Sequence, residues 1–198
     1  MSGNGGWANP APAGLVALAV ACFTFYCVLT GHVGHTSIPL LACWLLGGFV
    51  VQLVVAIIEL KEGATVGGNV FLYFSAFFML TGAAEFIVKA YFGTVHGAPI
   101  DTHIDGYAWI VLVSALILWT PAYMKTAPAL LSIAVIILDV ACVIVAGTDG
   151  GWLAKTWSPM AGNLLGLTGI IAIYLSGAIQ LNTAFGRTIL PMPGPMIK

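Results

Sequence analysis

Long apolar stretches alternate with short polar ones along the whole chain. The stretches end where Gly, Pro, Asn or charged residues accumulate, and they cover residues 13–30, 38–60, 69–92, 107–124, 127–146 and 160–181. A helix needs roughly 20 apolar residues to cross the hydrocarbon core of a bilayer. Because backbone groups in a bilayer must satisfy their own hydrogen bonds, we interpret each stretch as a helix and not as a strand. The pattern predicts an all-α membrane protein with six transmembrane helices.

The composition agrees with this pattern and excludes several functions. Of the 198 residues, 60% are hydrophobic and 7% are charged, with a mean hydropathy of +1.04, whereas soluble domains carry about 25% charged residues. We therefore expect a single integral membrane domain over residues 1–198. A net charge of −1 without a basic cluster argues against a nucleic-acid partner.

Sequence motifs for nucleotide and catalytic chemistry are absent. The chain contains no P-loop, no dinucleotide fingerprint and no G-x-S-x-G, so we expect neither an ATP-driven pump nor an enzyme, and no cofactor. His32 and His35 have no third ligand nearby in the sequence, so no metal site is expected.

The positions of Lys and Arg suggest an orientation. With six spans both termini share one side, which would hold Lys61, Lys125, Arg187 and Lys198, whereas the other side would hold Lys89 and Lys155. Cytoplasmic loops carry an excess of positive residues. We therefore predict cytoplasmic termini in a multi-pass protein of the plasma or inner membrane.

Polar groups inside the predicted spans are the first candidates for function, because burying them in lipid costs several kcal/mol unless they face protein or water. Gln52 and Glu59 lie seven residues apart on the second span and so share a face. Glu59 is close to the end of that span, where a solvated role is an equally good interpretation.

The third span carries one stripe at steps of three and four residues, formed by Phe71, Phe74, Phe78, Thr81 and Glu85. Such a stripe is typical of a pore wall and equally of ordinary helix packing. Glu85 also precedes Lys89 by four residues, which fits a simple ion pair at the membrane interface.

Asp139 is the acid placed most deeply in an apolar stretch. One hypothesis is that it takes part in proton coupling, with Glu85 as a second proton-linked acid. The alternative is a protonated Asp139 that forms a hydrogen bond to a neighbouring helix.

Motifs at the two ends of the chain are similar to those of a known family. The run Asn9-Pro10-Ala11-Pro12-Ala13-Gly14-Leu15 resembles the N-P-A-P-x-G-L signature of the acetate uptake transporter (succinate–acetate permease) family, and Asn182 with residues 185–191 resembles its closing segment. The similarity extends over Gly47, Gly48, Gln52, Glu59, Gly63, Tyr174 and Leu175. The first motif also has a physical reading, since its prolines and Asn9 fix the start of a helix whose free N–H groups suit a carboxylate.

The resemblance implies a function and an assembly. Family members are six-helix protomers assembled as hexamers, and each protomer has a narrow pathway for acetate and, in some members, succinate. By position, the apolar constriction of that pathway corresponds to Leu18, Phe74 and Ile137. The pore mouth and family motif correspond to residues that are mostly polar or Pro, namely Asn9, Pro10, Pro12, Gln52, Glu59, Asn69 and Arg187.

Several positions depart from the family pattern. Leu18 replaces a common aromatic residue, Phe74 replaces a common Tyr, and Ala64-Thr65 replaces Asn-Thr. These changes make the pathway less polar, so the preference between acetate and succinate stays open.

We therefore predict membrane transport of acetate and related small carboxylates, with succinate as a further candidate substrate, in a homo-oligomer within the lipid bilayer. We expect this transport to be coupled to or accompanied by protons, as in proton symport. The alternatives are a passive anion channel for small monocarboxylates without proton coupling and a non-transporting membrane scaffold or sensor.

Overall fold

The structure is a computed structural model and describes residues 6–198, so residues 1–5 of the predicted domain lie outside it. Its long helices are α1 (Ala11–Leu29), α2 (Ile38–Lys61), α5 (His103–Thr126), α6 (Ala129–Asp149) and α7 (Ser158–Phe185). The third span runs through α3 (Thr65–Tyr73), η2 (Phe74–Thr81), α4 (Gly82–Val88) and η3 (Lys89–Val95). Short 3₁₀ turns, η1 (His35–Ser37) and η4 (Lys155–Trp157), precede α2 and α7.

Within residues 6–198, six helical segments are long and apolar enough to cross a membrane, and no strand is present. The predicted all-α class with six apolar helices is confirmed, and the chain is a multi-pass membrane protein. The third span differs from a regular α-helix because η2 and η3 are π-helical. A π-helical turn holds more residues than an α-helical one, so it rotates the side chains that follow it.

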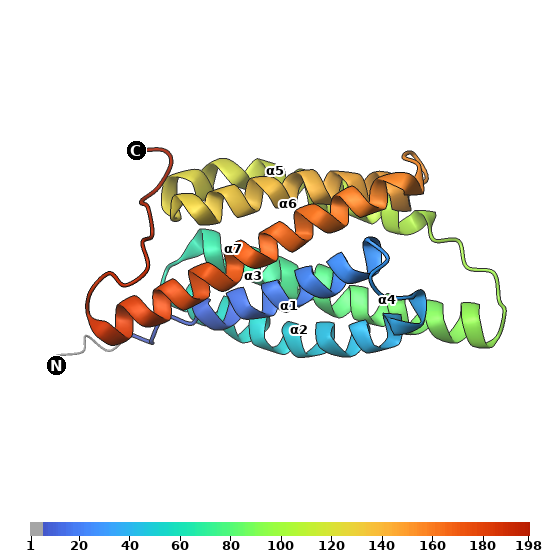
Figure 1. Cartoon of the computed structure of the whole chain (residues 1–198), viewed down its shortest axis with the longest axis horizontal. Helices are drawn as coiled ribbons and strands as arrows, with labels where there is room; N and C mark the ends of the chain where they lie inside the picture. Colours follow the sequence, from blue (N-terminus) through green and yellow to red (C-terminus); the bar gives the residue numbers. More distant parts are fainter. Residues whose placement is uncertain (1–5) are drawn as a thin grey trace.

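One connection is shorter than the sequence suggested. The predicted spans leave residues 93–106 as a connection, but η3 continues to Val95 and α5 begins at His103. Asp105 is buried in the first turn of α5, with 8% of its surface exposed, because it forms an ion pair with Lys89 on η3. This pair joins the third span to α5 at the end of the bundle away from the termini (Figure 1).

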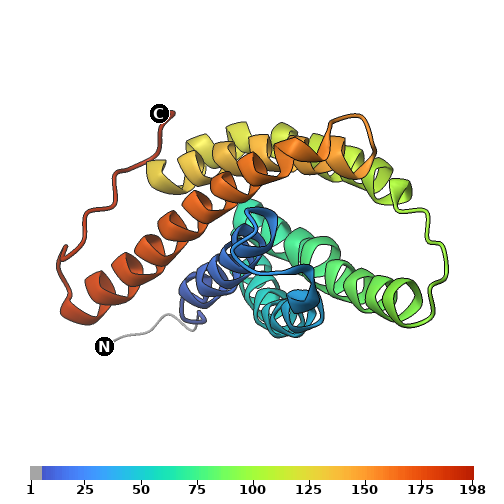
Figure 2. The ribbon, with the colours of Figure 1, turned by 45° about the vertical axis from the view of Figure 1, so that its right-hand side comes forward.

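The helices form two groups that meet along α1 and α7. Figure 1 shows both termini at the same end of the bundle, and Figure 2 shows α5, α6 and α7 arching over α1, α2 and the third span. The two groups meet most extensively where α1 packs against α7. Aromatic side chains fill the space between α1, the third span and α5, with Phe78 against Phe25, Phe74 and Trp109.

Glycines allow the close approach of α7 to α1. A Cβ on Gly162, Gly166 or Gly169 would lie 2.9, 3.1 or 2.8 Å from side-chain atoms of Leu29, Tyr26 and Phe23, respectively. Small residues at this spacing let helix backbones come together in a membrane, where dispersion contacts and not the hydrophobic effect drive association. The small-residue face of α7 is therefore buried inside the protomer.

Gly106 offers a test of this close packing, because a Cβ there would overlap the backbone N and Cα of Gly150 at the contact of α5 with α6. The backbone cannot rotate away as a side chain can, so we expect Gly106→Ala to destabilise the protein by about 1–3 kcal/mol. Thermal unfolding of the purified protein in detergent measures this loss. Gly177→Ala is the matched control, since a Cβ at Gly177 meets nothing within 4 Å. Equal melting temperatures of the two variants would contradict the prediction.

Candidate functional site

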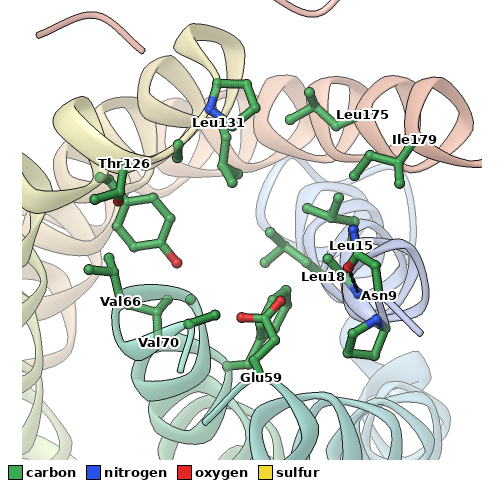
Figure 3. Close-up of a pocket in the computed structure, with 18 of the residues that line it drawn as sticks. Asn9, Leu15, Leu18, Glu59, Val66, Val70, Thr126, Leu131, Leu175 and Ile179 are labelled. Carbon is green, nitrogen blue, oxygen red and sulfur yellow. Dashed lines mark hydrogen bonds between the residues drawn. The ribbon is translucent and has the colours of Figure 1, made fainter. Parts of the chain in front are cut away.

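A cavity of about 850 Å³ (Figure 3) lies at one end of the bundle. Figure 1 shows that both termini are at the same end. The walls of the cavity come from the start of α1, the end of α2, the start of α3, the end of α5, α6 and α7. We call it the main cavity. Its lining includes Trp7, Asn9, Pro10, Leu15, Leu18, Gln52, Glu59, Glu62, Val66, Val70, Phe71, Phe74, Tyr123, Thr126, Leu131, Val135, Leu138, Leu175, Ile179 and Met192.

The segment before α1 borders the mouth of the main cavity and is fastened to the end of α2. The backbone N–H of Trp7 donates to Glu62 Oε1 at 3.0 Å, and Lys61 Nζ lies 4.5 Å from the centre of the Trp7 ring. Asn9 Oδ1 accepts a hydrogen bond from the N–H of Ala11 at 2.9 Å, which satisfies one free donor at the start of the helix. Asn9 and Pro10 are thus parts of a fixed rim.

The closing motif holds the tail beside the same cavity. Asn182 Oδ1 accepts hydrogen bonds from the N–H groups of Ile189 and Leu190, while its Nδ2 donates to the carbonyl of Leu190. The hydroxyl of Tyr174 donates to the carbonyl of Pro191 at 2.8 Å. These bonds turn the chain back after α7 and bring Met192 into the lining.

Gln52 and Glu59 line the main cavity from one face of α2, as their spacing predicted. Gln52 is 1% exposed, its Nε2 lies 3.4 Å from the carbonyl of Gly14, and its Oε1 has no partner among the described residues. Glu59 is 9% exposed. Within residues 6–198 its carboxylate receives no hydrogen bond and forms no ion pair. Figure 3 shows the carboxylate directed into the cavity between Val70 and Leu18.

The deep end of the main cavity is apolar. Leu18 and Phe74 line it together with Val135 and Leu138 of α6. Ile137, the third residue of the expected constriction, is not among the lining residues, and its neighbour Leu138 takes that place. Behind Phe74 lies Phe78, with ring centres 5.6 Å apart. The polar rim therefore leads to an aromatic and aliphatic floor.

Asp139 of α6 does not line the main cavity and instead contacts α5. Its Oδ2 accepts a hydrogen bond from the hydroxyl of Thr120 on α5 at 2.7 Å, and its Oδ1 has no partner among the described residues. Next to Thr120, the ring of Trp119 packs edge-on against Tyr73 of the third span. Asp139 thus links α6 to α5, as in the alternative of a hydrogen bond to a neighbouring helix.

Glu85 lies at the opposite end of the bundle. Lys89 Nζ is 3.4 Å from Glu85 Oε2 and also binds Asp105, and all three residues line a second cavity of about 260 Å³. The residues of the stripe on the third span therefore lie in three different environments. Phe71 and Phe74 line the main cavity, Phe78 packs in the core, and Thr81 and Glu85 line the second cavity.

The segment beside the second cavity contains one further pair of ionisable groups. The ring Nδ1 and the backbone N–H of His103 lie 2.7 and 3.0 Å from Asp101 Oδ1. These hydrogen bonds hold the pKa of Asp101 below its usual range, first through the ring and then through the backbone. Both side chains are well exposed, so this pair is worth little to stability.

The remaining predicted residues are not brought together at the cavity. The carbonyl of Pro12 accepts a hydrogen bond from the Ser176 hydroxyl at 2.9 Å, which links α1 to α7. Asn69 is exposed and donates to the carbonyl of Thr65 on its own helix. Arg187 is exposed after the end of α7. Among residues 6–198 no three His, Cys, Asp or Glu side chains gather to hold a metal ion.

Sequence reasoning missed several lining residues. Tyr123, Val135 and Leu138 line the main cavity, but no motif marked them. Tyr123 is a polar residue at the end of a predicted span, which is a weak signal. Val135 and Leu138 carry no signal, because apolar residues surround them on every side of α6.

These features define a multi-pass α-helical membrane protein in which a single chain encloses a polar-rimmed cavity with an apolar floor. The model of the GPR1/FUN34/yaaH family matches residues 4–194, and the chain belongs to this family, which includes the acetate/succinate permeases. The resemblance inferred from the two end motifs is thereby confirmed.

A solved structure has the same fold. The structure of the bacterial acetate channel SatP superposes with a TM-score of 0.81 at 21% sequence identity, covering 94% of this chain and 99% of that chain. No curated protein matches the sequence significantly.

The bond between Thr120 and Asp139 generates a stability prediction. Thr120→Val keeps the side-chain shape and removes the only hydrogen bond that Asp139 receives within the described chain. A buried polar group left without a partner costs about 1–3 kcal/mol, so we expect a lower melting temperature in detergent. Thr168→Val is the matched control, because buried Thr168 bonds only to a carbonyl of its own helix. A Thr120 variant as stable as this control would refute the link.

Proposed function

We propose that the protein moves acetate and related small carboxylates across the membrane through a path inside each protomer. The observation that carries this proposal is the main cavity, whose polar rim at Asn9 and Glu62 leads past Glu59 and Gln52 to the apolar floor at Leu18 and Phe74. Membership of a family that includes acetate/succinate permeases supports the choice of substrate. So does the shared fold with a bacterial acetate channel. Such an activity involves no covalent chemistry.

The apolar floor is the proposed source of selectivity. A small monocarboxylate, or its neutral acid, loses less hydration on passing Leu18 and Phe74 than a dicarboxylate does. Acetate is therefore the preferred substrate of the proposal, and succinate is a poorer one. A passive channel remains the alternative mechanism, and its mark is a flux that is independent of protons. A scaffold or sensor would show no flux.

The proposal includes a membrane and an assembly. The excess of Lys and Arg on the side of the termini supports cytoplasmic termini in a plasma or inner membrane, with the main cavity facing the cytoplasm. Large apolar side chains cover the outer faces of α2 and α5, among them Leu40, Trp44, Val50, Val111 and Leu118. These faces suit lipid or neighbouring copies, which agrees with a homo-oligomer such as the hexamer implied by the family resemblance.

Uptake of radiolabelled acetate into liposomes that contain the purified protein tests this function. We expect saturable, protein-dependent acetate uptake that unlabelled formate reduces more strongly than succinate does, because the floor disfavours a second charge. Protein-free liposomes give the flux of acetic acid through lipid, which is subtracted. Uptake equal to that control would overturn the proposed function.

Substitutions at Leu18 test the site of selectivity. Leu18 is partly buried at the floor, so Leu18→Ala widens the passage at a modest cost in packing. We expect the ratio of succinate to acetate uptake to rise several-fold in Leu18→Ala and to fall in Leu18→Phe. Val16→Ala is the control, since Val16 is 42% exposed on the same helix and does not line the cavity. An unchanged ratio in both Leu18 variants would place the selectivity elsewhere.

A further inference from the structure

We propose that Glu59 exchanges a proton with the transported carboxylate in the main cavity, so that the substrate crosses the apolar floor as a neutral acid. This inference rests on the proposed function and assigns the proton step to a residue. Three observations support it: the position of the carboxyl group, its lack of partners among residues 6–198, and the amide of Gln52, which lies deeper on the same face of α2.

The first observation is the position of the carboxyl group. Glu59 is 9% exposed and lines the main cavity from the last turns of α2. The start of α3 packs against it so closely that a Cβ on Gly67 would overlap Glu59 Oε2. Glycine at position 67 therefore leaves room for the carboxyl group, which Figure 3 shows at one wall, directed toward the open centre of the cavity. The carboxyl group is therefore accessible to a solute that has entered the main cavity.

The second observation is that no cation among residues 6–198 pairs with Glu59. Of the other charged or titratable residues, Glu62 after α2 and Tyr123 on α5 line the same cavity. Glu62 accepts a hydrogen bond from the backbone N–H of Trp7, and the ammonium group of Lys61 lies over the Trp7 ring and forms no ion pair with Glu59. The described lining residues from α1, α3, α6, α7 and the tail include no charged or titratable group. An ionised Glu59 would thus repel an entering carboxylate, whereas a protonated Glu59 donates a hydrogen bond to it.

The chemistry balances without any further reactant. The O–H bond of protonated Glu59 breaks, an O–H bond forms on the substrate, and the negative charge moves from the substrate to Glu59. Both groups are alkyl carboxylic acids with nearly equal affinity for a proton, so the exchange is close to thermoneutral. Water at the mouth restores the proton on Glu59, and the reverse sequence applies to flux in the other direction.

The third observation is the acceptor that comes next along the path. Gln52 lies seven residues before Glu59 on the same face of α2, and its buried Oε1 has no partner among the described residues. The N–H₂ group of the same amide is turned to the carbonyl of Gly14. An amide oxygen accepts a hydrogen bond from a neutral acid but repels an anion. Gln52 therefore favours the species that Glu59 produces.

The other two candidate acids do not meet the substrate in the main cavity. Glu85 forms an ion pair with Lys89 beside the second cavity. Asp139 accepts a hydrogen bond from the hydroxyl of Thr120 and does not line the main cavity. Neither is placed to exchange a proton with a carboxylate that has entered from the rim.

The test compares Glu59→Gln with Glu59→Asp in liposomes that contain a trapped pH dye, with acetate uptake and internal pH followed together. We expect the wild-type protein to bring in one proton with each acetate, and an inward proton gradient to accelerate uptake. Glu59→Gln keeps the size of the side chain but cannot release a proton, so we expect at least a tenfold loss of gradient-driven uptake. Glu59→Asp keeps a titratable carboxyl and is expected to retain the gradient response at a lower rate.

Three further variants separate the role of Glu59 from general effects. Asp149→Asn removes an acid that pairs with Lys155 at the far end of the bundle and is expected to behave as wild type. Asp139→Asn, in which the Asn oxygen still accepts from Thr120, is expected to keep the gradient response. Gly67→Ala retains Glu59 but displaces its carboxyl group, and it is expected to weaken the response even if Glu59→Gln does not fold.

The outcomes are distinct. A wild-type gradient response in Glu59→Gln, or its loss in Asp139→Asn alone, overturns the inference. Equal loss of uptake in Glu59→Gln and Glu59→Asp also overturns it, because a purely structural residue would behave in that way. Acetate flux without protons in the wild type leaves the proposed transport intact and removes only the role of Glu59. The absence of any protein-dependent flux removes the proposed function itself.

Discussion

The close contact between α1 and α7 is the interaction on which the rest of the architecture depends. The three glycines of α7 let its backbone approach α1, and the Ser176 hydroxyl fixes the register by binding the carbonyl of Pro12. Because the two helices are locked together, Leu15 and Leu18 of α1 join Leu175 and Ile179 of α7 in one rigid wall of the main cavity (Figure 3). The two end motifs lie at the edges of this wall, which explains why they need fixed turns.

Polar groups in the bundle divide into two kinds, and the division separates structure from function. Lys89 is matched by Glu85 and Asp105 where it joins the third span to α5, and Thr120 is matched by Asp139 between α5 and α6. Such pairs hold helices together in an apolar medium. Gln52 and Glu59, in contrast, line the main cavity. Gln52 Oε1, like Asp139 Oδ1, is buried without a partner among residues 6–198, and the Glu59 carboxylate receives no hydrogen bond from these residues. An unmatched buried polar group has a cost, and a passing solute is the partner that would remove it.

The sequence predicted the number and order of the helices better than the rotation of each helix about its own axis. Six apolar stretches sufficed for the six helices, and the spacing of Gln52 and Glu59 placed both on the cavity face, because that part of α2 is a regular helix. The family resemblance pointed to Ile137 on α6, but Val135 and Leu138 line the main cavity instead of Ile137, because packing determines how α6 is rotated. The apolar pattern also missed the π-helical segments of the third span and the burial of Asp105, which depend on contacts with distant residues.

The apolar floor determines the free-energy cost for any anion that crosses it. Moving a bare carboxylate into a medium of low dielectric constant costs on the order of 20 kcal/mol in the idealised limit and still several kcal/mol after relaxation. Protonating a carboxylate of pKa about 4.3 at pH 7 costs only about 4 kcal/mol, at 1.36 kcal/mol for each pH unit. Leu18, Phe74, Val135 and Leu138 offer no hydrogen-bond donor to an anion. The neutral acid is therefore the species that this floor admits at the lower cost, and a proton donor is most effective immediately before it, where α2 presents Glu59.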